Sequence, residues 1–187
     1  ETEGDIAYDS VAVNDAVVFG GAVWQPDGGQ VGGALAFDGI DDYVSTPFVL
    51  NPANGAFRVF AWIKGGVAGE VVLSQIEGAN WLCTDSLEGN LMTGLSRPAG
   101  GRIPPQPLVS EFVITDGNWH HIGLVWDGAQ RILYVDDVEV ARDVGALNAL
   151  KGSENGLYIG AGGSMEQGTF WSGLIDDVRI YNRAVHP

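Results

Sequence analysis

The feature that most constrains the fold is a series of short apolar segments separated by turn-forming residues. Such residues stand at Asp38-Gly39, Asp116-Gly117-Asn118, Asp127-Gly128 and Asp136-Asp137. No window of roughly 11 residues keeps a helical period. Short strands with turn signals at this spacing predict an all-β protein, a β-sandwich or barrel. The expected strands are Ala34–Phe37, Tyr43–Ser45, Phe57–Lys64, Val71–Gln75, Phe112–Thr115, His120–Trp126, Ile132–Val135, Val138–Ala141, Leu157–Gly160 and Gly173–Tyr181.

Three segments give finer expectations. Phe57–Lys64 is apolar at both parities, which predicts a central strand covered on both faces. Asp136-Asp137 between two apolar runs predicts a tight hairpin, because Asp tolerates positive φ better than most residues. Ser96–Leu108 contains four of the eight prolines and is expected to be a loop, because proline removes ladder donors.

Charge and cysteine content exclude several classes of protein. The 187 residues contain 9 Lys and Arg against 24 Asp and Glu, a net charge of −15. This balance opposes nucleic acid, whose affinity depends on cations that neutralise phosphate. No apolar run approaches the ~20 residues of a spanning helix, so membrane insertion is not expected. The single cysteine, Cys83, forms no internal disulfide and is expected to be a small buried hydrophobe.

Six blocks of sequence, taken in order, resemble the LamG-like jelly-roll family of the concanavalin A-like lectin/glucanase superfold. They cover most of the chain from residue 33 onwards. The blocks are residues 33–47 (GALAFDGIDDYVSTP), 57–64 (FRVFAWIK), 117–128 (GNWHHIGLVWDG), 133–141 (LYVDDVEVA), 156–160 (GLYIG) and 170–184 (FWSGLIDDVRIYNRA).

The resemblance implies a two-sheet antiparallel β-sandwich, the concanavalin A-like jelly roll, in an extracellular or cell-surface setting. Residues 1–187 are then one LamG-like domain, a module of a larger protein. Glu1–Asp5 resembles the tail of the family's opening segment, so we expect the first strand to be truncated.

Catalytic constellations are poorly supported. Retaining glycosidases need two carboxyls ~5–5.5 Å apart, and related glucanases carry them in a Glu-x-Asp-x-x-Glu strand motif. Asp136-Asp137-Val-Glu139 does not match that spacing, and no serine lies in Gly-x-Ser-x-Gly. His120 and His121 are expected to bond backbone groups of a neighbouring loop, with ligand contact as the alternative. We therefore predict a protein that is not an enzyme.

Calcium is the ion that the sequence favours, because it takes ~6–8 oxygen ligands. The turn Asp38-Gly39-Ile40-Asp41-Asp42 carries three carboxylates. The family resemblance implies a structural Ca²⁺ to which Asp42 and Asp176 contribute, so Asp38, Asp41, Asp42 and Asp176 are the candidate metal ligands. In the alternative reading, Asp38 and Asp41 make Asx turns and Asp176 pairs with Arg179 or Arg183.

Tryptophans are the candidate sugar platforms, since sugar rings stack their C–H faces on aromatic rings. Strand alternation places Trp62, Trp119 and Trp126 in the core. Trp24, Trp81 and Trp171 lie near Gly, Asn, Pro or Ser and are candidates for an exposed stacking site, with core packing as the alternative. Three polar residues from nearby segments complete the predicted carbohydrate contacts: Asn80, Arg97 and Arg102.

The resulting hypothesis is a non-catalytic, extracellular, lectin-like module whose partner is a carbohydrate or glycan. Two alternatives remain open at this stage. One is a protein-interaction or adhesion module, which a flat apolar surface patch would favour. The other is a structural spacer without a small ligand.

Overall fold

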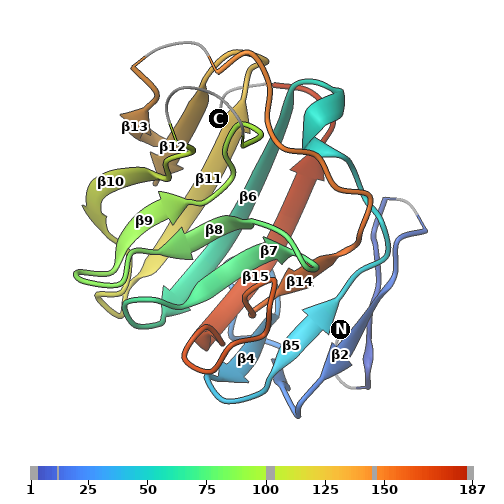
Figure 1. Cartoon of the computed structure of the whole chain (residues 1–187). Helices are drawn as coiled ribbons and strands as arrows, with labels where there is room; N and C mark the ends of the chain where they lie inside the picture. The colour runs from blue at the N-terminus through green and yellow to red at the C-terminus, as the bar shows by residue number, and fades with distance from the viewer. Residues whose placement is uncertain (1–3, 12, 100–103, 145–146, 185–187) are drawn as a thin grey trace.

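The computed structural model describes residues 4–11, 13–99, 104–144 and 147–184 as two antiparallel sheets packed face to face (Figure 1). The eight-stranded sheet has the order β1 (Ile6–Ala7), β2 (Ala16–Phe19), β5 (Tyr43–Ser45), β14 (Leu157–Ile159), β7 (Val71–Gln75), β8 (Asn80–Thr84), β9 (Asn90–Thr93), β10 (Leu108–Val113). The seven-stranded sheet has the order β13 (Val138–Arg142), β12 (Arg131–Val135), β11 (Trp119–Trp126), β6 (Phe57–Gly65), β15 (Ser172–Tyr181), β4 (Ala34–Asp38), β3 (Val23–Gln25).

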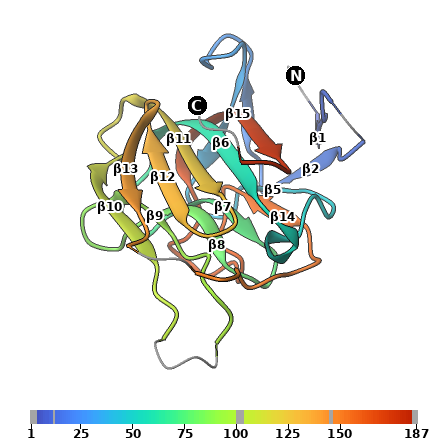
Figure 2. The same ribbon diagram turned by 90° about the horizontal axis from the view of Figure 1, so that it is seen from above.

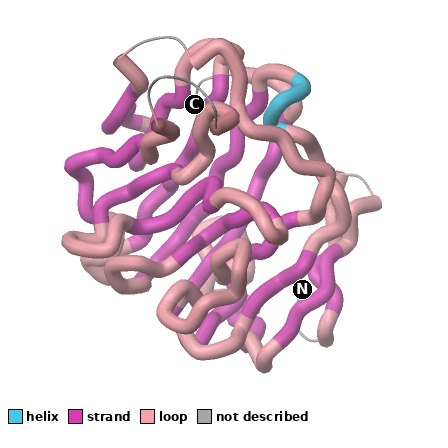
Figure 3. The backbone as a smooth tube through the Cα atoms, viewed as in Figure 1, coloured by secondary structure: helices cyan, strands magenta, loops and turns pink. Residues whose placement is uncertain are grey.

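The predicted all-β sandwich is confirmed. Among the described residues the helical element is a single 3-10 turn at Pro52–Asn54 (Figure 3). No helix in this part of the chain is long and apolar enough to cross a membrane. One predicted strand is displaced: pairing in β10 begins at Leu108 and ends at Val113, rather than running over Phe112–Thr115.

Strand β6 shows how the sequence builds the interior. Phe57, Val59, Ala61 and Ile63 alternate along it and are at most 2% exposed, because they face the eight-stranded sheet. The residues between them, from Arg58 to Lys64, face outward. On both sides β6 is paired, with β11 and with β15, which confirms its predicted central position. The predicted cover of its outer face is wrong, since Lys64 is exposed and Arg58 and Trp62 are half-buried.

The hairpin between β12 and β13 closes at Asp136 and Asp137, as predicted. Their φ angles are 51° and 65°, the left-handed conformation that a two-residue turn of this kind requires. The turn directs the Asp136 and Asp137 carboxylates toward β11, where each meets a histidine.

A buried ion pair anchors the proline-rich loop between β9 and β10, which extends away from the sandwich in Figure 2. Arg131 Nη2 and Asp143 Oδ1 are 2.7 Å apart, and the two side chains are 4% and 10% exposed. Arg131 Nη1 also donates to the carbonyl oxygens of Leu95 and Gln106. One guanidinium thus holds both described ends of this loop against the seven-stranded sheet.

Candidate functional site

A groove of about 350 Å³ crosses the outer face of the seven-stranded sheet. Its floor comes from the central strands β6, β11 and β15, and one wall comes from the β3–β4 turn. The groove combines aromatic rings with charged groups of both signs. Its lining residues are Val31, Arg58, Phe60, Trp62, His121, Asp137, Asp177, Arg179 and Tyr181.

An aromatic stack forms the centre of the groove. The His121 ring stacks with Trp62 at a centroid distance of 4.9 Å and with Phe60 at 5.3 Å. The register explains this arrangement, because His121 pairs with Trp62, and Gly123 pairs with Phe60. At Gly123 a Cβ would lie 2.2 Å from Phe60 Cε1, so the absent side chain makes room for the ring.

Charged groups surround the stack. The Arg58 guanidinium lies 4.2 Å from the centroid of the Tyr181 ring, a cation–π distance. Arg179 Nε donates to Asp177 Oδ1 at 2.9 Å, and this hydrogen bond raises the pKa of Arg179. His121 Nδ1 lies 3.1 Å from Asp137 Oδ1. The groove therefore offers apolar ring surface together with hydrogen-bond donors and acceptors.

Asp176 positions one wall of this groove and lies apart from the other predicted metal ligands. Its Oδ2 accepts from the backbone amides of Gln30 at 2.7 Å and Val31 at 2.8 Å, which fixes the β3–β4 turn. In place of the alternative pairing of Asp176 with Arg179 or Arg183, the structure pairs Arg179 with Asp177. Along β15, Asp176 lies four residues beyond Ser172, the residue that pairs with Asp38.

Asp38, Asp41 and Asp42 do come together, with one ligand atom of each within 4.8 Å of the others. Asp42 is 4% exposed and accepts from the Asp38 amide at 2.9 Å, while Asp38 Oδ1 accepts from the Ile40 amide at 2.8 Å. Burial, together with the nearby Asp38 and Asp41 carboxylates, raises the pKa of Asp42. The Asx turn that the alternative reading gave Asp38 is present, and the all-oxygen donor set of the cluster suits a hard cation such as Ca²⁺.

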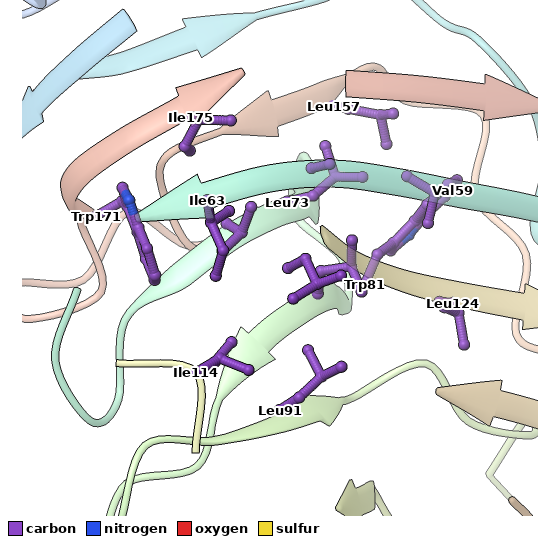
Figure 4. Packing of buried hydrophobic residues seen from close by; sticks show 14 of the residues in the cluster. Val59, Ile63, Leu73, Trp81, Leu91, Ile114, Leu124, Leu157, Trp171 and Ile175 are labelled. Atoms are coloured by element: carbon purple, nitrogen blue, oxygen red, sulfur yellow. The ribbon is translucent and has the colours of Figure 1, made fainter. Parts of the chain in front are cut away.

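The expected exposure of Trp81 and Trp171 is wrong, because both side chains are 0% exposed and lie between the sheets (Figure 4). Register shifts in the β7–β8 pair allow both Trp81 and Leu82 to face the core. Trp171 packs on Gly66, where a Cβ would lie 2.3 Å from the indole. Neither ring can stack on a sugar in this fold.

Trp62 was expected in the core but lies on the outer face of its sheet. Trp126 is buried as expected, but Trp62 and Trp119 are only half-buried. Trp62 shares its parity with Arg58 and Lys64, and this charged flank is the sequence signal that marks the outward face of β6. Sequence reasoning therefore missed the central aromatic residue of the groove.

The predicted polar contacts do not converge on the groove. Asn80 starts β8 and lines a pocket on the other sheet. Arg97 is half-buried in the loop after β9. Arg102 lies outside the described residues.

The two histidines of β11 bond carboxylates rather than the backbone groups expected from sequence. The His120 ring nitrogens lie 2.8 Å from Asp136 Oδ2 and 3.1 Å from Asp116 Oδ1. His120 is 7% exposed, whereas His121 lies in the groove. The structure thus assigns His120 to the β11 terminus and His121 to the candidate site.

Fold and groove together define a jelly-roll sandwich with an aromatic site on one sheet. The chain belongs to the concanavalin A-like lectin/glucanases superfamily, because the Laminin_G_3 family model with that description matches residues 38–187. A search of curated proteins found no match.

Three of the solved structures that match illustrate this fold. The binding domain of Paraclostridial Mosquitocidal Protein 1 has a TM-score of 0.73 at 13% identity, over 96% of this chain and 48% of that one. Domain 4 of AbnA, an extracellular arabinanase of Geobacillus stearothermophilus, was solved in complex with arabinotriose. It has a TM-score of 0.60 at 16% identity, over 91% of this chain and 83% of that one. A Trypanosoma rangeli sialidase in complex with sialic acid has a TM-score of 0.63 at 21% identity, over 99% of this chain and 30% of that one. The chain thus spans about half of the toxin domain and less than a third of the sialidase.

Proposed function

We propose that this chain is a non-catalytic carbohydrate-binding module whose glycan site is the groove around Trp62. The observation that carries the proposal is the stack of Trp62, His121 and Phe60 in a groove that Arg58 and Arg179 also line. Aromatic faces suit the C–H faces of a sugar ring, and the charged groups suit its hydroxyls.

Two relatives support this proposal by analogy of fold. The arabinanase domain is described in complex with arabinotriose and the sialidase in complex with sialic acid. An extracellular or cell-surface setting is part of the proposal, supported by the description of the arabinanase as extracellular.

The test is a glycan array followed by calorimetry on each glycan bound. We expect Trp62→Ala to weaken binding tenfold or more, about 1.4 kcal/mol. Trp24→Ala serves as the matched control, because Trp24 is also half-buried but lies on β3, outside the groove lining. Unchanged affinity in folded Trp62→Ala, or an array with no bound glycan, would remove the basis for this site.

We further propose a structural Ca²⁺ at Asp38, Asp41 and Asp42. Its support is the clustering of three carboxylates and the raised pKa of Asp42, which a bound cation would reverse. Calcium at 100 times its Kd would stabilise the fold by about 2.7 kcal/mol. Thermal unfolding in calcium and in chelator tests this, with Asp41→Asn expected to abolish the difference and Asp27→Asn expected to keep it.

A further inference from the structure

A second and larger pocket, of about 550 Å³, lies on the outer face of the eight-stranded sheet. Its floor is a row of apolar side chains on four neighbouring strands. The pairing register aligns Val71 with Cys83, Cys83 with Met92, and Met92 with Val109. Val71 and Cys83 are 1% exposed, whereas Val109 is 42% exposed, so the row opens to solvent at its β10 end.

The rim is the turn between β8 and β9, and it is acidic. Asp85 Oδ1 accepts from the amides of Leu87 at 2.7 Å and Glu88 at 2.8 Å, and its Oδ2 accepts from Asn90 at 3.1 Å. Burial acts to raise the pKa of Asp85, but these amides outweigh it and the pKa is lowered. The rim carboxylate therefore stays ionised at neutral pH and holds the turn beside the floor.

Asn90 contributes an unmet acceptor to the pocket wall. The residue is 7% exposed, and its Nδ2 donates to Glu88 Oε2 at 3.1 Å. Its Oδ1 is buried without a hydrogen-bond partner. An unsatisfied buried acceptor costs about 1–3 kcal/mol, so a donor supplied from the pocket would stabilise the site.

The charges in this pocket are of one sign. Among its described lining residues there is no Lys, Arg or His, while Asp85 and Glu88 are both present. Apolar floor and acidic rim together match a side chain that lays an aliphatic stem on an apolar surface and ends in a cation. The net charge of −15 adds a long-range attraction for such a group.

We propose that this pocket binds a primary ammonium group carried on an aliphatic stem, such as the side chain of a lysine in a peptide. The stem lies on Met92 and Val109, at the open end of the row, and the ammonium group reaches the rim formed by Glu88 and Asn90. The site is independent of the glycan groove, which occupies the outer face of the opposite sheet.

The test is an NMR titration that follows the Met92 methyl group and the Asn90 side-chain amide. The probes are Nα-acetyl-lysine amide and Nα-acetyl-norleucine amide, which share an aliphatic stem and differ in the ammonium group. We expect saturable shifts with the lysine probe and at least tenfold weaker binding of the norleucine probe. Equal responses to the two probes, or no saturable shift with either, would overturn the proposal.

Two charge-removing variants distinguish binding at the rim from a general effect of the protein's net charge. Glu88→Gln should weaken the lysine probe severalfold, whereas Glu154→Gln, at an exposed site far along the sequence, should leave it unchanged. Equal weakening by both variants would reduce the effect to net charge and overturn the proposal. Trp62→Ala should retain lysine binding, so failure of the glycan site and failure of this site are distinguishable. If 1-aminopentane binds as tightly as the lysine probe, the result would support an ammonium site whose ligand is a free amine rather than a lysine in a peptide.

Discussion

Arg131 gives the sharpest stability test of this fold. Replacing it with Met keeps the aliphatic stem but removes every donor of the guanidinium. The change leaves Asp143, 10% exposed at its side chain, without its cation, and it leaves the carbonyl groups of Leu95 and Gln106 without their donor. Breaking a buried pair from one side costs about 3–5 kcal/mol, because the remaining charge stays buried without its cation. The backbone amide of residue 131, which donates to Asp143 Oδ2 at 2.8 Å, remains as a donor.

The expected loss is a large fraction of the stability of an ordinary domain, about 5–15 kcal/mol. For a chain of this size each kcal/mol lowers Tm by about 2–4 °C, so Arg131→Met should lower Tm by roughly 6–20 °C. Asp143→Leu should destabilise the protein for the same reason. Because the double variant leaves no orphan charge, its cost should fall below the sum of the two single costs by 2 kcal/mol or so.

The assay is urea unfolding followed by tryptophan fluorescence, with amide hydrogen exchange to report on the loop after β9. In Arg131→Met, exchange should rise first at the two ends of that loop. Arg142→Met is the matched control, since its partner Glu139 is solvent-accessible and the pair should contribute at most about 1 kcal/mol. A loss below 1 kcal/mol in Arg131→Met, or additive costs in the double variant, would refute the reasoning.

Three further predictions concern the two sheets. Burial raises the pKa of the Cys83 thiol from 9.0 to about 12, so its contribution to stability is complete below pH 9 and is lost toward pH 12. Between these pH values the free energy of unfolding of the wild type should fall by about 1.4 kcal/mol more per pH unit than that of Cys83→Ala. Parallel curves of unfolding free energy against pH would contradict this. Trp81→Ala should cost about 3–5 kcal/mol in chemical denaturation, as for a core aromatic residue, and a loss under 1 kcal/mol would contradict its buried position. Gly123→Ala should tilt Phe60, cost about 1–3 kcal/mol and weaken glycan binding in calorimetry. Gly117→Ala, at a φ of 83° in a turn outside the groove lining, should also cost stability but leave the affinity unchanged.

Much of the sandwich follows from local sequence. Strands such as β6 were predictable because Phe57–Gly65 is long and apolar, and the β12–β13 turn was predictable from Asp136-Asp137. Strands β8 and β9 were not predicted, because they are short and their flanking glycines and asparagines also suit loops.

The candidate site was not predictable at the same level. Local composition placed Trp81 outside, and strand alternation placed Trp62 inside. Both placements are wrong, because a register shift beside β8 turns Trp81 to the core and the opposite parity of β6 fills the core. Asp38, Asp41 and Asp42 were predictable as a cluster since one turn carries them. Asp176 could not be separated from them without the β4–β15 register.

The position of β15 has a consequence for how the chain reaches its native state. β15 inserts between β6 and β4 in the seven-stranded sheet, although most of the described sequence separates it from both partners. Until Ser172–Tyr181 has left the ribosome, β4 and β6 each present an unpaired edge in the middle of the nascent sheet. Closure therefore waits for a long-range pairing step, the kind of step that slows folding and keeps strand edges open to aggregation.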